Sequence, residues 1–149
     1  MTSSSTTSTS PLPARTPVLI AGGGPVGLTM AALLARQGIA STVIEADSSF
    51  CDGSRAICMS RRSLEILGWI GADKPMLDKG LSWVGGRSYF RDREVLHFEM
   101  PAEPTQRFGP MVNIQQYYAE EFAHDAAIAT GLVDVRWSTR VSNVTPHGN

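Results

Sequence analysis

The sequence has few cysteines and histidines, the residues that most often bind zinc or form redox-active pairs. Its 149 residues include only two cysteines, Cys51 and Cys58, with six residues between them. The histidines at positions 97, 124 and 147 are scattered, so the chain contains neither a zinc-binding spacing nor a C-x-x-C pair. We therefore expect no metal site and two reduced thiols.

Long apolar runs and clusters of one charge are missing as well. No run approaches the roughly 20 apolar residues that span a bilayer. The net charge is −1 and no basic run occurs, so nothing indicates binding to nucleic acid or to an anionic membrane. The composition, 42% hydrophobic and 18% charged, is typical of one globular domain. We expect a cytoplasmic protein whose partner is a small molecule.

The first 15 residues, MTSSSTTSTSPLPAR, consist almost entirely of Ser, Thr and Pro. They lack the apolar surface whose burial would offset the entropy of ordering them. With a single arginine and no apolar run, they resemble neither a secretory nor an organellar signal. We predict a disordered tail over residues 1–15.

The most informative stretch is VLIAGGGPVGLTMAALLARQGIASTVIE, residues 18–45. Its first four residues predict a buried strand, and the glycines that follow form the pattern G-x-G-x-x-G. Gly22 permits a tight turn, Gly24 lets the backbone approach a pyrophosphate, and Gly27 lets the following helix lie close to the strand.

A helix is expected to begin at Pro25 and to end at Gly38. Its predicted apolar face consists of Val26, Met30, Leu33 and Leu34. Residues 42–45 then predict a second, parallel strand with a carboxylate at its end. Together these elements would form a βαβ unit, for which the less favoured alternative is a glycine-rich surface turn.

Such a unit is typical of dinucleotide binding, because the unpaired N–H groups at the helix N-terminus favour a phosphate. Glu45, which stands 18 residues after Gly27, is placed to accept hydrogen bonds from the adenosine ribose hydroxyls. Its charge would repel a 2′-phosphate, so the ribose of FAD or NAD is expected, and these residues alone do not separate the two. A solvated strand end is the alternative role for Glu45.

Weaker patterns follow the βαβ unit. A loop carries Arg55, and residues 60–71 predict a helix with Ser60 as its N-cap. We expect Arg61 and Arg62 to be in solvent at the start of this helix.

The remaining chain mixes strands and one helix. Residues 83–90 and 94–98 favour a β-hairpin, whose aromatic side chains are either sheet core or pocket wall. Residues 117–130 predict a helix with an apolar face of Tyr118, Phe122, Ala126 and Ala129. Further strands are expected over residues 111–114, 132–137 and 140–144.

Three segments together resemble one known family. The βαβ unit that ends in Glu45, the segment SRAICMSRRSLEILGWIG and the later VNIQQYYAEEF are similar to the N-terminal part of the FAD-dependent aromatic-ring hydroxylases, the p-hydroxybenzoate hydroxylase-like flavoprotein monooxygenases. The 3-(3-hydroxyphenyl)propionate hydroxylase branch is the most similar. The resemblance runs from about residue 18 to residue 144.

The resemblance implies a set of cofactor-binding residues. Arg55 would lie beside the flavin phosphates and ribityl chain, with a solvent-exposed loop charge as its alternative role. Gln116 would contact the flavin, although the adjacent Gln115 is a competitor and a simple helix cap is an alternative. The predicted cofactor-binding residues are Gly22, Gly24, Pro25, Val26, Gly27, Glu45, Arg55 and Gln116. Catalytic residues stay unassigned.

The resemblance also implies a fold and an activity. The fold class is α/β: residues 16–149 would be the N-terminal portion of a Rossmann-like FAD-binding monooxygenase domain, with residues 80–112 as a hairpin and loop of the substrate-side sheet. The family hydroxylates phenolic or other aromatic acids with NAD(P)H and O2, and the full-length form could be a homodimer. The later Asp-Gly and Gly-Asp motifs are absent, so we expect an incomplete domain. An NAD-dependent reductase and a truncated, non-catalytic nucleotide-binding fragment are the alternatives.

Overall fold

The computed structural model describes residues 15–53, 58–101 and 103–148. The predicted tail, apart from Arg15, and the predicted cofactor ligand Arg55 lie outside these ranges. The elements in chain order are β1 (Val18–Ala21), α1 (Pro25–Arg36), β2 (Ser41–Ile44), β3 (Cys58–Ser60), α2 (Arg61–Trp69), α3 (Asp73–Lys79), β4 (Leu81–Trp83), β5 (Gly85–Phe90), β6 (Arg93–Glu99), β7 (Met111–Asn113), α4 (Gln116–Ile128) and β8 (Val133–Arg136). None of these helices is long and apolar enough to cross a membrane.

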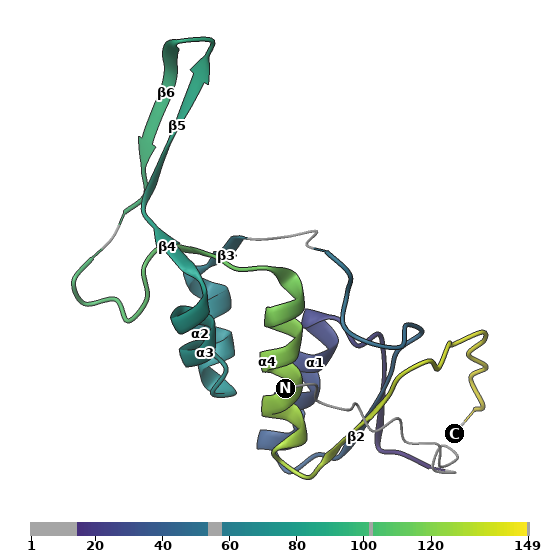
Figure 1. Cartoon of the computed structure of the whole chain (residues 1–149). Coiled ribbons are helices and arrows are strands. Elements are labelled where there is room, and N and C mark those ends of the chain that lie inside the picture. Colours follow the sequence, from purple (N-terminus) through teal and green to yellow (C-terminus); the bar gives the residue numbers. More distant parts are fainter. Residues whose placement is uncertain (1–14, 54–57, 102, 149) are drawn as a thin grey trace, which may run out of the picture.

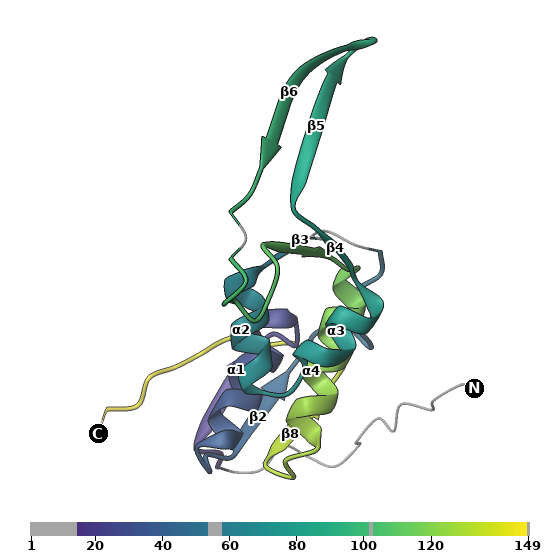
Figure 2. The ribbon, with the colours of Figure 1, turned by 90° about the vertical axis from the view of Figure 1, so that its left-hand side faces the viewer.

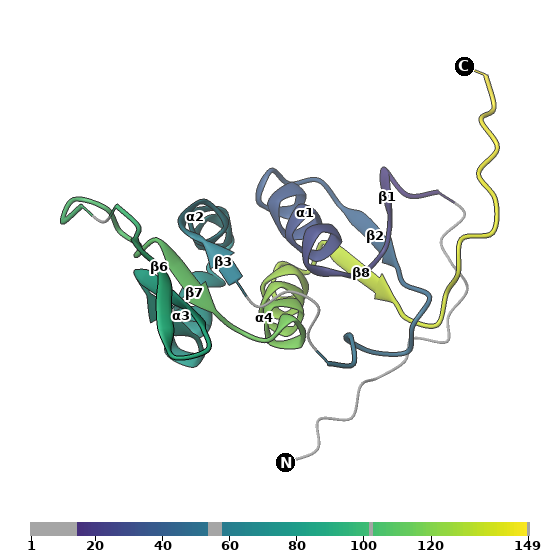
Figure 3. The same ribbon diagram turned by 90° about the horizontal axis from the view of Figure 1, so that it is seen from above.

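A three-stranded parallel sheet in the order β1-β2-β8 forms one half of the protein. Its register places Ile20, Val43 and Val135 side by side across the three strands. Helices α1 and α4 cover the face that carries these side chains (Figure 3). The predicted βαβ unit is therefore present, and β8 pairs with the free side of β2.

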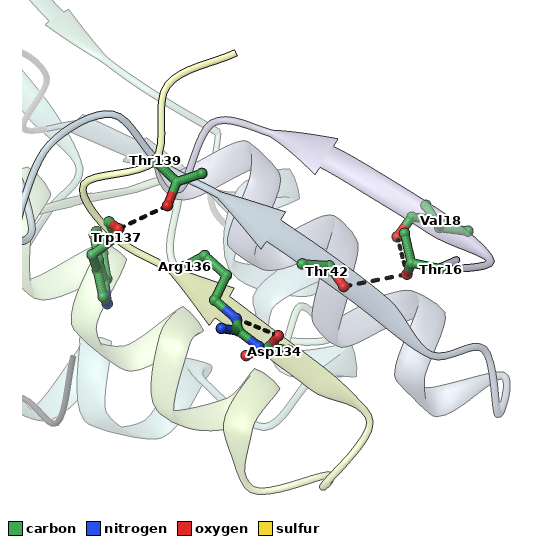
Figure 4. Close-up of polar contacts among 7 residues, drawn as sticks. All are labelled: Thr16, Val18, Thr42, Asp134, Arg136, Trp137 and Thr139. Atoms are coloured by element: carbon green, nitrogen blue, oxygen red, sulfur yellow. Dashed lines mark hydrogen bonds and ion pairs between the residues drawn. The ribbon is translucent and has the colours of Figure 1, made fainter. Parts of the chain in front are cut away.

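The opposite face of this sheet is more polar. Arg136 Nε donates a hydrogen bond to Asp134 Oδ2 at 2.6 Å, and Thr42 Oγ1 donates to Thr16 Oγ1 at 3.2 Å (Figure 4). On the edge strand β1, Leu19 is 52% exposed. The prediction of a buried first strand is thus wrong: Val18 and Ile20 are only half-buried and the other two residues of β1 are exposed, because α1 and α4 cover one face of this edge strand.

Helices α1 and α4 pack against each other through small side chains. The buried residues of α1 are Leu28, Ala31, Ala32 and Ala35, and those of α4 are Ala119, Glu120, Ala123 and Ala127. Alanines allow two helices to approach closely, so the alanine faces are buried in place of the larger apolar ones.

The buried faces of α1 and α4 differ from the apolar faces predicted for these helices. In α1 the predicted face is wrong, because Val26 and Met30 are 82% and 50% exposed. In α4 the predicted face is only half-buried, since Tyr118 and Phe122 pack beside a separate core, and Ala129 lies beyond the helix end. An i, i+4 pattern fits two faces of the same helix, and only the neighbouring elements decide which face is buried.

The second half of the protein packs larger side chains around a small antiparallel sheet in the order β3-β7-β4. Ser60 caps α2, as predicted, by accepting a hydrogen bond from the backbone N–H of Ser63 at 3.3 Å. The core of this half consists of Leu64, Leu67, Ala72, Met76, Phe108, Val112, Ile114 and Ala119. The short helix α3 was not predicted, because it buries only Asp73 and Met76 and so shows no apolar period.

Arg61, which was predicted to be in solvent at the start of α2, makes hydrogen bonds within the protein. Its Nε donates to the carbonyl oxygen of Phe108 at 3.0 Å, and its Nη2 donates to that of Pro101 at 2.8 Å. Arg62, in contrast, stays at the surface in an ion pair with Glu65 at 2.7 Å. The predicted solvated helix start is therefore right for Arg62 and wrong for Arg61, which ties the loop after β6 to α2.

Strands β5 and β6 form the predicted hairpin, which projects away from the rest of the protein (Figures 1 and 2). Arg91 at its turn has a positive φ of 54°. All residues from 87 to 99 are exposed, among them Tyr89 at 57%, Phe90 at 66% and Leu96 at 52%. The hairpin is thus an extension with no core of its own.

Beyond β8 the chain is irregular. Residues 140–148 contain neither helix nor strand, so the strand predicted over residues 140–144 is wrong. Val141 and Val144 are 39% and 79% exposed. A strand needs a neighbour for its backbone hydrogen bonds, and within the described ranges this segment pairs with none.

Candidate cofactor site

The turn from β1 to α1 has the backbone geometry that its glycines were predicted to provide. Gly22 has a φ of 108°, and its N–H donates to the carbonyl oxygen of Ile44 at 2.8 Å. A Cβ on Gly27 would overlap the carbonyl oxygen of Gly22 and lie 3.3 Å from Ile20 Cγ2. The close packing of helix on strand therefore depends on Gly27, as predicted.

The N-terminus of α1 carries no side-chain cap. Gly24 is the N-cap residue, Pro25 occupies the first turn, and no acidic side chain lies in that turn. A Cβ built on Gly24 would have Glu120 Oε1, at 3.9 Å, as its nearest neighbour, so the backbone is open on this side. Uncapped N–H groups and the helix dipole make this end of α1 suitable for an anion.

Glu45 follows β2 and faces the glycine turn. Its Oε2 accepts a hydrogen bond from the backbone N–H of Gly23 at 2.6 Å, and its Oε1 accepts one from that of Asp47 at 3.0 Å. Burial, the largest single influence, favours the neutral acid. The backbone hydrogen bonds from Asp47, Gly23 and Ala46, with the charge of Arg140, outweigh it and lower the pKa of Glu45 below its usual 4.5. Glu45 is therefore a carboxylate at neutral pH.

A cleft of about 540 Å³ joins these features. It is lined by Gly23, Gly24, Glu45, Asp47, Ser48, Ser49, Phe50, Cys51, Asp52, Gln116, Glu120 and Trp137. Of the residues predicted to bind the cofactor, Gly24, Glu45 and Gln116 thus meet at one cleft. Pro25 and Val26 border a different, apolar groove of about 360 Å³. Gln115, the competitor of Gln116, is the exposed N-cap of α4 and is not among the lining residues.

Two residues that line this cleft, Glu120 and Trp137, were not predicted from the sequence. The buried Glu120 and the ring of Trp137 line it from α4 and from the end of β8. The position of Glu120 four residues after Gln116, one helical turn further along, was an available signal. No local pattern could have found Trp137, because its place depends on the pairing of β8 with β2.

Charge is unevenly distributed around the cleft. The ionisable side chains of its described lining, apart from the thiol of Cys51, are the carboxylates of Glu45, Asp47, Asp52 and Glu120. A bound anion must therefore rely on backbone N–H groups and on a cation from elsewhere. Backbone N–H groups of this kind lie in the glycine turn at the start of α1.

Known proteins match nearly all of this chain. The family model described as FAD binding domain matches residues 15–149. 6-Methylpretetramide 4-monooxygenase of Streptomyces rimosus is 28% identical over 133 residues, and the 3-(3-hydroxy-phenyl)propionate/3-hydroxycinnamic acid hydroxylase of Mycolicibacterium smegmatis is 31% identical over 146 residues. Each match covers 89% of this chain and 24% of the relative, so the chain spans about a quarter of the length of these curated relatives.

A solved structure supports the fold. The flavin-dependent monooxygenase PieE, in complex with FAD and substrate, superimposes with a TM-score of 0.70 at 24% sequence identity. The match covers 83% of this chain and 24% of that one, and at this identity it shows the fold alone. Together with the family match, these findings confirm the resemblance to the FAD-dependent aromatic-ring hydroxylases: the chain belongs to the FAD binding domain family.

Proposed function

We propose that this chain binds the adenosine and diphosphate part of FAD, as the N-terminal portion of a flavoprotein monooxygenase. The observation that carries the proposal is the uncapped N-terminus of α1 at Gly24, with the Glu45 carboxylate in the same cleft. The N–H groups of the first turn suit a diphosphate, and the carboxylate suits the ribose hydroxyls.

The donors and acceptors of the cleft fit such a ligand. Because the nearest neighbour of a Cβ position on Gly24 is Glu120 Oε1, at 3.9 Å, a diphosphate can approach the backbone there. Glu45 accepts backbone N–H groups from Gly23, Asp47 and Ala46, and a carboxylate offers about four acceptor positions. A ribose hydroxyl can therefore bind Glu45 without breaking the hydrogen bonds that hold it.

The other predicted ligands have distinct proposed roles. Pro25 presets the backbone of the first helical turn. Val26 is proposed to contribute its backbone N–H and not its side chain, which is 82% exposed and borders the separate apolar groove. Arg55, three residues after Asp52 of the cleft lining, would supply the cation that the acidic lining lacks. Gln116 would contact the flavin end of the cofactor.

The activity of the whole protein is proposed from its relatives. A relative named as a 3-(3-hydroxy-phenyl)propionate/3-hydroxycinnamic acid hydroxylase supports a phenolic or other aromatic acid as substrate. The co-substrates NAD(P)H and O2 are proposed from the resemblance to the FAD-dependent aromatic-ring hydroxylases alone. FAD supplies the redox chemistry when bound, and the residues of this chain bind and orient it. The exposed apolar side chains of the β5–β6 hairpin are proposed to belong to the sheet that covers the substrate.

Flavin titration tests the binding proposal. FAD is titrated into the 149-residue chain, and its fluorescence quenching is followed for the wild type, Gly24→Val and Glu45→Ala. We expect Gly24→Val to prevent close approach of the diphosphate. Glu45→Ala should lose roughly 1.5 to 3 kcal/mol, the usual range for a hydrogen bond to a charged group, which is about 10- to 100-fold in affinity.

Matched controls separate binding from folding. Gly109→Val adds the same side chain at a glycine with no atom within 4 Å of its Cβ position, and Glu103→Ala removes an exposed carboxylate. Both should bind FAD like the wild type. Wild-type affinity in Gly24→Val and Glu45→Ala would contradict the proposed site, and tighter binding of NAD than of FAD would favour an NAD-dependent reductase.

A further inference from the structure

Glu120 is a buried acidic residue that the binding proposal above does not use. It lies in α4, one helical turn after Gln116, and is 3% exposed. Its Oε1 accepts a hydrogen bond from Gln116 Nε2 at 2.8 Å, and its Oε2 accepts one from the backbone N–H of Cys51, also at 2.8 Å. Burying a carboxylate is costly unless it is hydrogen-bonded, so these two partners account for its place in the interior.

The two hydrogen bonds join segments that are far apart in the sequence. Cys51 belongs to the irregular loop that follows Glu45, and 69 positions separate it from Glu120. A backbone N–H that donates to a charged oxygen makes one of the stronger hydrogen bonds in proteins. Glu120 therefore anchors, at Cys51, the loop that leads from Glu45 along the cleft.

The same carboxylate determines how the Gln116 amide is turned. A carboxylate can only accept hydrogen bonds, so the group of Gln116 that faces it must be the NH2. With the NH2 directed at Glu120, the carbonyl oxygen of the amide points away from Glu120. If Glu120 were a neutral amide, it could pair with either end of the Gln116 side chain, and the orientation would no longer be determined.

Glu120 also borders the glycine turn. Its Oε1 is 3.9 Å from the Cβ position of Gly24, and it lines the same cleft as Gln116 and Glu45. We infer that Glu120 is a positioning residue for FAD: it orients the Gln116 amide and anchors the loop at Cys51, without itself binding the cofactor. This inference rests on the proposed function, since it assumes that Gln116 contacts the flavin.

A double-mutant cycle tests the inference. FAD affinity is measured for the wild type, Glu120→Gln, Gln116→Ala and the double variant. Glu120→Gln keeps the shape and removes the charge, and should weaken binding about tenfold, the order expected when one hydrogen bond to a charged group is lost. In the Gln116→Ala background the same change should weaken binding by less than about twofold, because Glu120 then has no amide to orient. Glu121→Gln, on the next residue of α4, is the matched control.

A second measurement does not need the cofactor. In the ligand-free chain, NMR follows the side-chain NH2 resonances of Gln116 and the hydrogen exchange of the Cys51 amide. We expect the Gln116 resonances to shift in Glu120→Gln but not in Glu121→Gln, and the Cys51 amide to exchange faster in Glu120→Ala. A merely structural role for Glu120 would change the melting temperature without shifting the Gln116 signals selectively.

The outcomes separate the two proposals. If the wild type binds no FAD, the proposed function fails, while the NMR signals still report whether Glu120 holds Gln116 and Cys51. If the wild type binds FAD and Glu120→Gln binds it equally well, the positioning role is overturned and the FAD site stands. An equal loss from Glu120→Gln with and without Gln116 would overturn the role through the amide.

Discussion

Two regions of the protein differ in how they place apolar residues. The parallel sheet with α1 and α4 buries them, and the β5–β6 hairpin exposes them. Around the sheet, α1 and α4 bury short alanine side chains at close distance. The hairpin carries large side chains such as Tyr89, Phe90 and Leu96, and exposes all of them. The region with the smaller apolar side chains is therefore the better packed, because burial depends on complementary neighbours rather than on the size of the residue.

The two regions should also contribute differently to the free energy of unfolding. The rest of the protein, called the body here, consists of the β1-β2-β8 and β3-β7-β4 sheets with helices α1 to α4. The body closes its own cores, whereas a two-stranded hairpin without a covering layer is marginal in water. Substitutions in the body should therefore lower the free energy of unfolding, and substitutions in the hairpin should hardly affect it. Urea unfolding of the 149-residue chain, followed by circular dichroism, measures both.

The largest effect is expected at a glycine of the body. Gly27→Ala should lower the free energy of unfolding by more than about 3 kcal/mol or prevent folding, because its Cβ would overlap a backbone carbonyl oxygen that cannot move aside. The control is Gly86→Ala in the hairpin. There the Cβ would lie 2.8 Å from Cε1 of Phe98, a half-exposed ring that can rotate, so we expect a loss below about 1 kcal/mol. Similar losses at the two glycines would contradict the contrast between the regions.

A smaller effect is expected where α1 and α4 meet. Ala127→Leu adds three carbons at a fully buried position of α4 and should cost about 1 to 3 kcal/mol of unfolding free energy. Ala129→Leu makes the same change at an exposed position just beyond the helix and should leave stability within about 0.5 kcal/mol. Equal stability of both variants would show that the helices leave room at Ala127.

Glu45 should affect stability in a pH-dependent way. Its pKa is lower in the folded protein than the usual 4.5, so its contribution is fully present above pH 4.5 and is lost as the pH falls through the folded pKa. Glu45→Gln should therefore be less stable than the wild type at pH 7, by at most about 1 kcal/mol since solvent screens this partly exposed group. The difference should shrink when unfolding is repeated below pH 4.5. A difference that grows in acid would show that the carboxylate is destabilised by folding.

The smallest effect is expected in the hairpin. Phe90→Ser and Leu96→Thr each replace an exposed apolar side chain and should leave the free energy of unfolding within about 0.5 kcal/mol of the wild type. A loss above about 1 kcal/mol would mean that these side chains pack in solution. The hairpin, like the body, would then depend on buried apolar side chains for its stability.

Predictions from the sequence succeeded where the signal is local. The turn at Gly22, the cap at Ser60 and the hairpin with its turn at Arg91 each depend on a few adjacent residues. They failed where the outcome depends on distant neighbours. Met30 has the right spacing for a buried face, yet it is half-exposed because the alanines of α4 pack against the other side of α1.

The candidate site divides in the same way. The residues of the turn suffice to predict the glycine turn, the helix that begins there and the carboxylate of Glu45, because backbone conformation and strand–helix–strand order follow from short-range preferences. The position of α4 beside α1, which brings Gln116 and Glu120 to that turn, becomes visible only in the folded protein. The hydrogen bond from Cys51 to Glu120 joins residues that are 69 positions apart, and closing so long a loop costs chain entropy. Packing elsewhere in the chain must offset this cost, so no local preference near either residue predicts the contact.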